Sequence, residues 1–524
     1  MITMRMKKGI IKEIVTLGLA VVTTLSMGIV ASAADVTIKG PKNGHTYEVY
    51  QIFTGDVDST NKLSNAKYGT VAKLTGSEKV GDAVPSETLN NLAGVASASS
   101  DRAKLEEILK YVDESKLDGT TDNLAATITN DKFTATVPSG YYLIKDKENS
   151  ILDNNNKAEA YTLYLVAVAG TTITISPKSD VPTVEKHVKE DSTDIWGKDA
   201  DAELNQKVEF KLTGTLPTDY ANYEYYTYEF EDTFTGMDFD STSVKVTIDS
   251  EDGTDITSAF TVDTSVTGKV TITCTNLKDN AATTGLTKDN KIIVTYKASL
   301  NDAAVIGNPG NPNKVDLVYS NNPNVKADGT KNTTDKTPED KVVVFTYEID
   351  VNKYDSNTKT QLADAEFVLI NSAGKYAKLD ANNKVTEWVA SYEGVTECVL
   401  TSSATEAIKI IGLDAKDEYK LKEIKAPTGG YQQLTKDITI KIDATITDAA
   451  ITAITATVDT PASLESTDYT NGKVTVKVPN TKKSNLPTTG GMGTKMFYIG
   501  GAVLMAVAAI ASVSYTHLTL PTIA

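Results

Sequence analysis

The sequence predicts a mainly β protein: tandem immunoglobulin-like β-sandwich domains, the first with some helix, followed by one transmembrane segment. Most of the chain consists of short runs rich in Val, Thr and Tyr that alternate with polar residues and are separated by Asn, Asp and Gly, which is typical of antiparallel strands. Residues 99–112 show the one good helical periodicity, with Asp101 in the first turn. An apolar run at residues 497–513 has the length of a membrane span.

The amino terminus has the layout of a secretory signal peptide. Basic residues precede an apolar run at 14–30, and the small-x-small triplet Ala31-Ser32-Ala33 follows it, so we expect residues 1–33 to be removed on export. The chain that remains before the apolar tail divides by composition into three domains, with a polar linker at 326–340. The expected domain bounds are 34–178, 179–337 and 341–482.

Composition argues against several classes of function. The net charge is −17 and the pI is near 4.8, which disfavours nucleic acid as a partner and fits a surface exposed outside the cell. With three histidines and two cysteines, the chain offers no catalytic triad, phosphate-binding loop or CxxC pair. We expect no turnover enzyme, no cofactor and no metal site. Cys274 and Cys398 lie in different predicted domains, so no disulfide is expected between them, and their state is left open.

Two lysines lie on the apolar faces of predicted strands. Because residues i and i+2 of a strand share a face, Lys186 is in phase with Val184 and Val188. Lys353 is likewise in phase with Val351, and each lysine stands near the start of its domain. A lysine that is buried without a partner is costly, so both are expected to have one.

The same phase argument gives each of these domains an inward acid in its middle and an inward asparagine at its end. Asp232 and Glu423 continue the apolar faces of central strands, and Asn321 and Asn480 continue those of the last strands. The order Lys, acid, Asn therefore occurs twice.

Such a set has a specific chemistry available to it. Burial lowers the pKa of an amine and raises that of a carboxyl group, so a neutral lysine can attack an asparagine carboxamide while the acid moves protons and ammonia leaves. Holding the groups together in a folded core supplies the proximity. The reaction happens once per molecule. The alternative is an ordinary buried ion pair beside a hydrogen-bonded asparagine.

The pentapeptide Leu486-Pro487-Thr488-Thr489-Gly490 stands just before the apolar run. This arrangement resembles a cell-wall sorting signal of Gram-positive bacteria. The resemblance implies that a sortase cleaves between Thr489 and Gly490 and transfers the Thr489 carboxyl to an amine. A plain membrane anchor with an incidental LPTTG is the alternative. The final residues, 514–524, lack the basic residues that normally end such a signal, and we expect them to be non-native.

The chain resembles a sortase-assembled major pilin, the fimbrial backbone subunit of Gram-positive bacteria, over nearly its full length. The second domain resembles an isopeptide-forming fimbrial domain and the third a collagen-adhesin B-type domain. The motifs that carry this resemblance are Tyr228-x-Phe230-x-Asp232-Thr233, Tyr319-Ser320-Asn321, Leu362-Ala363-Asp364-Ala365-Glu366-Phe367, Tyr419-x-Leu421-x-Glu423-x-x-Ala426-Pro427-x-Gly429 and Val478-Pro479-Asn480. The resemblance implies isopeptide bonds Lys186–Asn321 and Lys353–Asn480, assisted by Asp232 and Glu423.

Lys178 is the candidate for the bond between subunits. It is in phase with Thr174 and Ser176 and should be exposed, and it follows Pro177 as in the pilin motif, although Ser176 and Ser179 replace the usual Tyr and Asn. Lys189 is the alternative. The resemblance implies a head-to-tail fibre, with Thr489 of one subunit joined to Lys178 of the next.

The implied partners are sortase, identical subunits and peptidoglycan, with minor pilins and a host or community ligand left open. The implied location is the cell wall and a surface fimbrium, after a membrane-held stage. The alternative function is a monomeric wall-anchored adhesin that binds a host ligand and has no need of Lys178.

Overall fold

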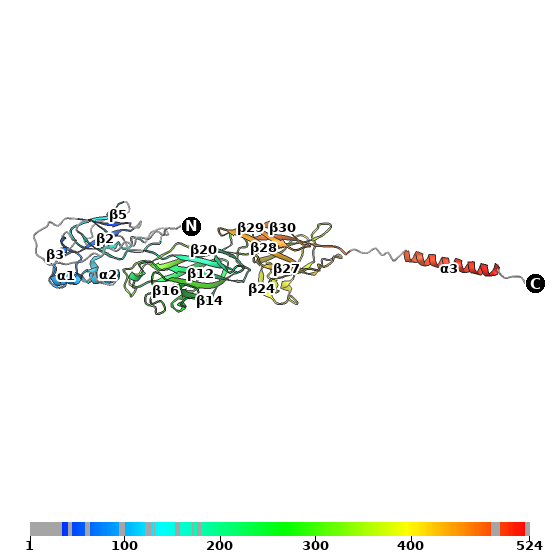
Figure 1. Ribbon diagram of the computed structural model, residues 1–524, viewed down its shortest axis with the longest axis horizontal. Helices are drawn as coiled ribbons and strands as arrows, with labels where there is room; N and C mark the ends of the chain where they lie inside the picture. Colours follow the sequence, from blue (N-terminus) through cyan, green and yellow to red (C-terminus); the bar gives the residue numbers. More distant parts are fainter. Residues whose placement is uncertain are drawn as a thin grey trace, which may run out of the picture.

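The computed structural model shows three β domains in a row followed by a separate helix (Figure 1). It describes residues 34–39, 45–57, 63–93, 100–120, 127–129, 132–151, 158–169, 172–175, 180–483 and 493–518. The expected signal peptide, Lys178 and the LPTTG motif lie outside these residues. The predicted fold class is confirmed. We refer to residues 34–175, 180–345 and 347–483 as domains 1, 2 and 3.

Domain 1 combines two four-stranded sheets with short helices. The first sheet has the order β4-β5-β1-β8 and the second the order β3-β2-β6-β7. Its elements are β1 (Ala34–Lys39), β2 (Tyr47–Val57), β3 (Leu63–Tyr68), α1 (Ser86–Ala93), α2 (Asp101–Leu109), η2 (Glu114–Lys116), β4 (Thr127–Thr129), β5 (Lys132–Val137), β6 (Gly140–Asp146), β7 (Leu165–Ala169) and β8 (Ile173–Ile175). The predicted helix is confirmed as α2, where the Ser100 side chain accepts the Ala103 amide at 3.1 Å and so caps the first turn.

Domain 2 is a sandwich of two sheets. The five-stranded sheet has the order β10-β9-β12-β17-β14, and the other has the order β11-β20-β18-β13-β16-β15, with β19 paired to β18. The strands are β9 (Val184–Glu190), β10 (Ile195–Gly197), β11 (Asp199–Asp201), β12 (Lys207–Thr215), β13 (Tyr228–Phe234), β14 (Met237–Ile248), β15 (Thr261–Asp263), β16 (Lys269–Cys274), β17 (Lys291–Leu300), β18 (Asn311–Ser320), β19 (Thr334–Lys336) and β20 (Asp340–Phe345), and short helices η3 (Tyr220–Asn222) and η4 (Thr257–Ala259) connect them.

The boundary between domains 2 and 3 lies later than the sequence suggested. We expected a polar linker at 326–340 and a third domain from 341. Instead β19 and β20 both pair with β18, and the apolar residues Val342 and Val344 of β20 are buried in the core of domain 2. The polar composition of 326–340 hid the strand β19, and β20, which begins at Asp340, belongs to domain 2 rather than to domain 3.

Domain 3 is a second sandwich. One sheet has the order β26-β21-β31-β30 and the other β24-β23-β22-β27-β28-β29, with β25 paired to β22. The elements are β21 (Tyr347–Asp355), β22 (Glu366–Ile370), β23 (Tyr376–Leu379), β24 (Val385–Val389), η5 (Thr396–Cys398), β25 (Leu400–Thr401), β26 (Ile408–Leu413), β27 (Glu418–Lys425), β28 (Ile438–Thr447), β29 (Ala450–Val458), β30 (Ser463–Asp468) and β31 (Lys473–Asn480). Its first strand, β21, runs parallel to its last strand, β31, over eight residue pairs.

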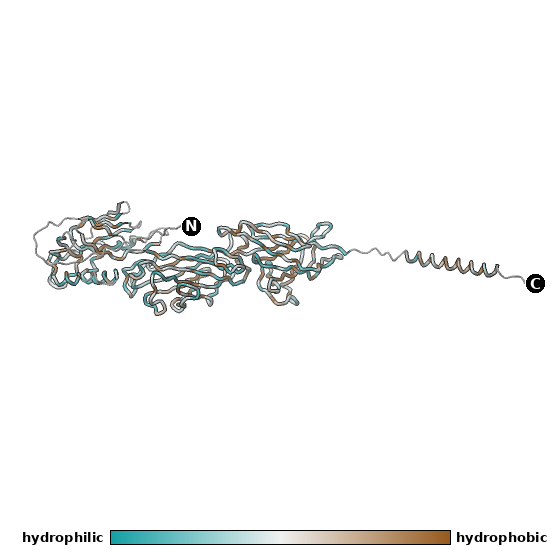
Figure 2. Tube along the Cα trace, in the orientation of Figure 1, coloured by the Kyte–Doolittle hydropathy of each residue, from teal (hydrophilic) through white to brown (hydrophobic). Residues whose placement is uncertain are grey.

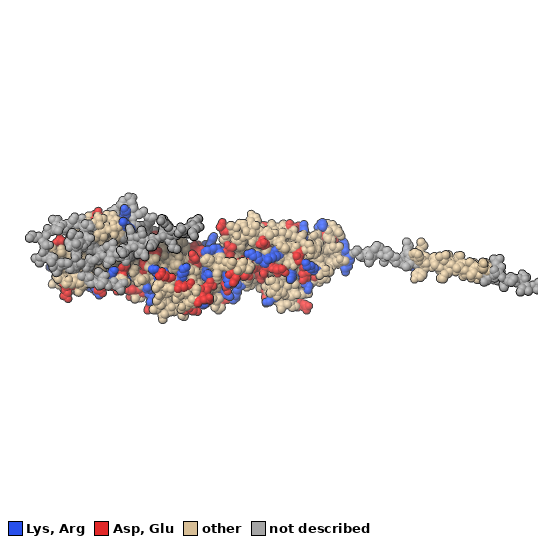
Figure 3. Space-filling view, viewed as in Figure 1, with Lys and Arg blue, Asp and Glu red and all other residues tan. Residues whose placement is uncertain are grey.

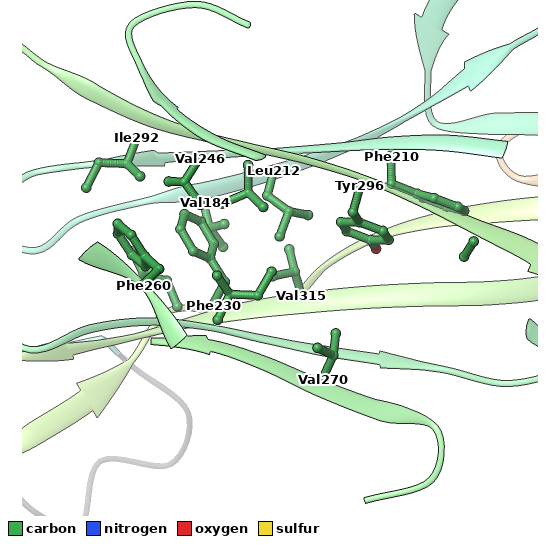
Figure 4. Packing of buried hydrophobic residues seen from close by; sticks show 14 of the residues in the cluster. Val184, Phe210, Leu212, Phe230, Val246, Phe260, Val270, Ile292, Tyr296 and Val315 are labelled. Carbon is green, nitrogen blue, oxygen red and sulfur yellow. The ribbon is translucent and has the colours of Figure 1, made fainter. Parts of the chain in front are cut away.

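The cores follow from strand alternation. Hydrophilic and hydrophobic residues alternate along the strands (Figure 2), and the inward side chains of both sheets of domain 2 meet in one cluster. Figure 4 shows Phe230 and Val315 of one sheet facing Leu212 and Tyr296 of the other. Lys, Arg, Asp and Glu are interspersed on the visible surface of domains 2 and 3 (Figure 3). Cys274 and Cys398 are free thiols, each buried in its own domain.

The helix α3 (Gly493–Leu518) follows domain 3 and carries the expected apolar run. Residues 495–515 within it, 21 in number, are all exposed, and a stretch of 18 of them has a mean hydropathy of 2.1. By length and composition this is the one helix among the described residues that could cross a membrane, and it contains the predicted span 497–513.

Domains 2 and 3 are in direct contact across their boundary. The Leu204 amide donates to the Gly412 carbonyl at 3.1 Å, and a Cβ on Gly412, whose φ is +94°, would lie 2.4 Å from the Leu204 side chain. The indole of Trp388 donates to Glu203 Oε2 at 2.7 Å. Domains 1 and 2 are joined likewise, since the Tyr161 amide donates to the Asn321 carbonyl at 2.7 Å. The three domains therefore form a continuous rod.

Two carboxyl groups meet at the boundary between domains 2 and 3. Asp201 and Asp414 are both buried there, and the Tyr347 hydroxyl donates to Asp201 Oδ2 at 3.1 Å. Burial, together with the charge of Glu190, raises the pKa of Asp201 to about 7. Burial and the neighbouring Asp201 raise the pKa of Asp414 as well.

This pair predicts a pH-dependent boundary. A carboxyl group whose pKa is raised by folding contributes stability that is fully present below its unfolded pKa, near 4, and is lost as the pH rises toward 7. Asp201→Asn replaces this carboxyl group with an amide that is uncharged at every pH. Relative to that variant, we expect the wild-type free energy of unfolding to fall by on the order of 3 kcal/mol between pH 4 and 7.5, measured by urea unfolding with Trp388 emission. The exposed control Asp263→Asn should match the wild type. Parallel pH profiles for wild type and Asp201→Asn would contradict this account.

Candidate cross-link sites

In domain 3 the fold brings the three predicted residues together. Lys353 is on β21 and Asn480 ends β31, and because these strands are parallel neighbours, Asn480 lies beside Asp355, two residues beyond Lys353. Both inward side chains then face Glu423 on β27 of the opposite sheet. Each of the three residues is at most 3% exposed. The alternation that predicted them as inward is confirmed.

Glu423 stands between the amine and the amide. Lys353 Nζ lies 3.2 Å from Glu423 Oε1, and Asn480 Nδ2 donates to Glu423 Oε2 at 3.2 Å. The backbone amide of Leu434 donates to the same Oε2 at 2.7 Å, and Asn480 Nδ2 also donates to the Gln432 carbonyl at 2.5 Å. One carboxyl group therefore contacts both groups that the proposed condensation would join.

The electrostatics of this site make the neutral form of the amine more accessible than in an exposed lysine. Burial lowers the pKa of Lys353 to about 8, against the opposing effect of Glu423. Among the described residues, Asn480 Oδ1 has no hydrogen-bond partner, and Lys353 Nζ has only its 3.2 Å ion pair with Glu423. A buried polar atom without a partner calls for an explanation, and a reactive pair supplies one.

Domain 2 holds the second lysine and acid as predicted. Lys186 of β9 and Asp232 of β13 are both fully buried, and Lys186 Nζ donates to Asp232 Oδ2 at 2.6 Å. Burial lowers the pKa of Lys186 more strongly than Asp232 raises it. The lysine also lies 5.6 Å from the centre of the Phe210 ring.

For domain 2, the prediction of Asn321 as the partner of Lys186 is wrong. The Asn321 side chain accepts the Thr333 hydroxyl at 2.6 Å, beyond the end of β18, and is not part of the Lys186 cluster. Asn313, on the same face of β18, occupies the site instead: its Nδ2 donates to the Tyr296 hydroxyl at 2.8 Å, and that hydroxyl donates to Asp232 Oδ2 at 2.5 Å. Asn313 is fully buried, and no described residue is hydrogen-bonded to its Oδ1.

Period-two alternation could not choose between these asparagines, because Asn311, Asn313 and Asn321 are all in the same inward phase. The spacing carried the missing signal. In domain 3 the lysine and asparagine are 480 − 353 = 127 residues apart, and 313 − 186 is also 127, whereas 321 − 186 is 135. Strand pairing agrees, since Asn313 is the register partner of Phe234, two residues from Asp232.

Comparison with known proteins places these sites in a family context. Residues 347–457 match the family model of the SpaA prealbumin-like fold domain. The trypsin-resistant surface T6 protein of Streptococcus pyogenes serotype M6 is 32% identical over 214 residues, which are 39% of this chain and 33% of that protein. The match thus spans about a third of the length of this curated relative.

Solved structures extend the likeness to most of the chain. The T6 backbone pilin of serotype M6 Streptococcus pyogenes, a modular three-domain structure, aligns with a TM-score of 0.52 at 17% identity, covering 88% of this chain and all of that one. The chain has the fold of a Gram-positive backbone pilin. The major pilin SpaD of Corynebacterium diphtheriae aligns at 17% identity with a TM-score of 0.47, covering 86% of this chain and 98% of that one.

Domain 1 of this pilin fold also has a buried lysine, which is paired with a glutamate. Lys145 Nζ lies 2.9 Å from Glu48 Oε2, which also accepts the Tyr50 hydroxyl at 2.8 Å. Nearby, the ring nitrogens of His45 lie 2.7 Å from Asp146 and 2.8 Å from Glu159. Sequence reasoning missed both clusters, because Lys145 and Asp146 are adjacent in a strand that is buried on both faces. Among the described residues, no group of three or more His, Cys, Asp or Glu is placed to hold a metal ion.

The lowered pKa of Lys353 predicts a pH effect in a variant that keeps this lysine free. In Asn480→Ala, the folded lysine releases its proton near pH 8 while the unfolded lysine keeps it to about 10.5. We therefore expect the free energy of unfolding of domain 3 to rise by up to about 3 kcal/mol between pH 8 and 10.5. Urea unfolding followed by Trp388 emission in a Trp196→Phe background measures it. A slope that persists after the further change Lys353→Met would rule out this origin.

Proposed function

We propose that this chain is the shaft subunit of a covalently polymerised cell-surface pilus, and that Lys–Asn isopeptide bonds within domains 2 and 3 stabilise it. The observation that carries the proposal is the buried contact of Lys353, Glu423 and Asn480. Domain 2 supports it with a second lysine, acid and asparagine assembled from different strands.

In domain 3 the bond would join the Lys353 Nζ to the Asn480 Cγ and release ammonia. Glu423 accepts a proton from the lysine and supplies one to the departing amide nitrogen, since it contacts both. Because the fold already holds the reacting groups in contact in a core without water, no further entropy is lost in bringing them together. The product is a neutral amide in place of a buried ion pair, which removes the cost of burying two charges.

In domain 2 the proposed bond is Lys186–Asn313, assisted by Asp232. This replaces the pairing with Asn321 expected from the sequence. Each bond would close a loop of 127 residues and stabilise its domain by about 4–5 kcal/mol, if it acts on the unfolded chain as a disulfide does.

For polymerisation, we propose that a sortase joins the Thr489 carboxyl of one subunit to Lys178 of the next. In the chain, LPTTG stands between domain 3 and α3, which could hold the precursor in the membrane. Lys178 stands between β8 and β9, at the junction of domains 1 and 2. The alternative, Lys189, is only 26% exposed and its Nζ lies 2.5 Å from Asp194, so it is less available. Peptidoglycan would take the last subunit, and minor pilins would be accessory partners.

The polymer is tested on denaturing gels of wall extracts from cells that co-express a pilus sortase. We expect a boiling-resistant ladder for the wild type, and monomer alone for Lys178→Ala because no acceptor amine remains. Lys189→Ala is the matched control and should keep the ladder. A ladder in Lys178→Ala that disappears in Lys189→Ala would move the junction, and no ladder in any sample would favour a monomeric adhesin.

The internal bonds are tested by the intact mass of the exported domains. Each bond lowers the mass by one ammonia, about 17 Da, so the wild type should lack two ammonia equivalents. We expect Asn313→Ala and Asn480→Ala to lack only one each, and Asn321→Ala to lack both. Retention of both losses in Asn313→Ala would refute the assignment in domain 2. The full calculated mass in the wild type would refute the cross-links altogether.

A further inference from the structure

We propose that Tyr296 is a catalytic proton relay for the cross-link in domain 2, linking Asp232 to the amide nitrogen that leaves Asn313. The inference rests on the proposed function, because it assigns a residue to that same condensation. It starts from a difference between the two sites.

The two acids reach their amides differently. In domain 3 the two oxygens of Glu423 contact Lys353 and Asn480 directly, at 3.2 Å each. Asp232 has a side chain one methylene shorter, and its Oδ2 receives Lys186 and Tyr296, while no described residue is hydrogen-bonded to its Oδ1. Among the described residues, the hydrogen bonds that connect Asp232 to the Asn313 amide run only through the Tyr296 hydroxyl. In domain 2, Asp232 and the Tyr296 hydroxyl together thus fill the role that Glu423 fills alone in domain 3.

The Tyr296 hydroxyl contacts all three partners of the condensation. It accepts from Lys186 Nζ at 2.8 Å and from Asn313 Nδ2 at 2.8 Å, and it donates to Asp232 Oδ2 at 2.5 Å. Sequence analysis did not single out this residue of β17.

Packing fixes the position of this hydroxyl. The Tyr296 ring is 1% exposed and stacks on Phe210 with centroids 5.2 Å apart and ring planes 12° apart, as the two neighbouring rings in Figure 4 show. Phe239 lies 4.9 Å away on a third strand. Burial and the adjacent Asp232 raise the pKa of Tyr296 well above its usual value, so the hydroxyl keeps its proton and can donate it.

The proton path balances. One proton passes from the Lys186 ammonium to Asp232, which leaves a neutral amine and a neutral carboxyl. The Nζ lone pair forms a bond to Asn313 Cγ, and the Cγ–Nδ2 bond breaks. Tyr296 gives its hydroxyl proton to the departing Nδ2 and is reprotonated by the Asp232 carboxyl. The Asp232 carboxylate that this leaves then takes the proton that Nζ loses. The products are an amide, ammonia, a neutral carboxyl and the restored tyrosine.

The competing explanation is a tyrosine that only fills the core and satisfies its hydroxyl. Tyr228 provides the matched control: it is fully buried in the same core, and its hydroxyl donates to the Thr215 carbonyl at 2.9 Å, away from the reacting groups. Tyr228→Phe deletes one buried hydrogen bond from domain 2, whereas Tyr296→Phe deletes the three that its hydroxyl makes with the reacting groups.

The test is a time course of ammonia loss after cell-free synthesis of the full chain, quenched in acid and resolved by peptide mass. The domain 3 bond serves as an internal reference for folding. In Tyr296→Phe we expect the domain 2 bond to form on the order of 100-fold more slowly, with the domain 3 bond unaffected. Tyr228→Phe should form both bonds at the wild-type rate. Tyr296→Phe combined with Asp232→Glu should recover the domain 2 bond, because the longer acid reaches the amide itself.

Formation of the domain 2 bond at the wild-type rate in Tyr296→Phe would overturn the relay and leave the pilin proposal standing. Slow formation that Asp232→Glu does not recover would also overturn it, in favour of a purely structural tyrosine. A wild type that never loses ammonia would instead refute the cross-links, which keeps the two failures distinguishable.

Discussion

Two lysine amines buried beside carboxyl groups are the feature on which the rest of this structure depends. Lys186 and Lys353 are at most 1% exposed, in sandwiches whose cores are built mainly from apolar side chains. An ion pair in such a place is costly to desolvate and seldom repays that cost. The placement becomes favourable if the amine is consumed. Condensation with asparagine replaces two charges by one neutral amide, so the same burial that destabilises the pair as an ion pair drives it towards reaction.

Topology then decides what such a bond can do. In domain 3 the first and last strands are parallel neighbours, so a bond between Lys353 and Asn480 connects the entry and exit of the domain. In domain 2 the bond would reach Asn313, near the start of β18, and would leave the later part of β18, β19 and β20 outside the closed loop. These strands continue directly into domain 3. A rod with direct contacts at both boundaries, and with covalent links inside two domains, suits a subunit that carries tension.

The sequence predicted much of this and missed identifiable parts. Period-two alternation found Lys186, Lys353, Asp232, Glu423 and Asn480, because a polar residue among inward valines and tyrosines stands out. It failed for Asn313 because β18 has more than one inward asparagine, and phase alone does not give position along a strand. It missed Tyr296 because an inward tyrosine is ordinary until the partners of its hydroxyl are known. The boundary near residue 345 was missed because polar composition resembles a linker, while pairing across strands cannot be seen in a single segment. Lys178 and the LPTTG motif lie outside the described residues and remain predictions.

The central claim, that covalent bonds hold residues 186–313 and 353–480 against tension, is tested most directly by pulling single molecules from the two ends of the exported chain. If Lys186 is bonded to Asn313 and Lys353 to Asn480, neither loop of 127 residues can extend. The account predicts that no step from domain 2 or 3 approaches the length of such a loop, and that only domain 1 and the chain between Asn313 and Lys353 lengthen. Two additional steps of about 450 Å, the length of 127 extended residues, would contradict it.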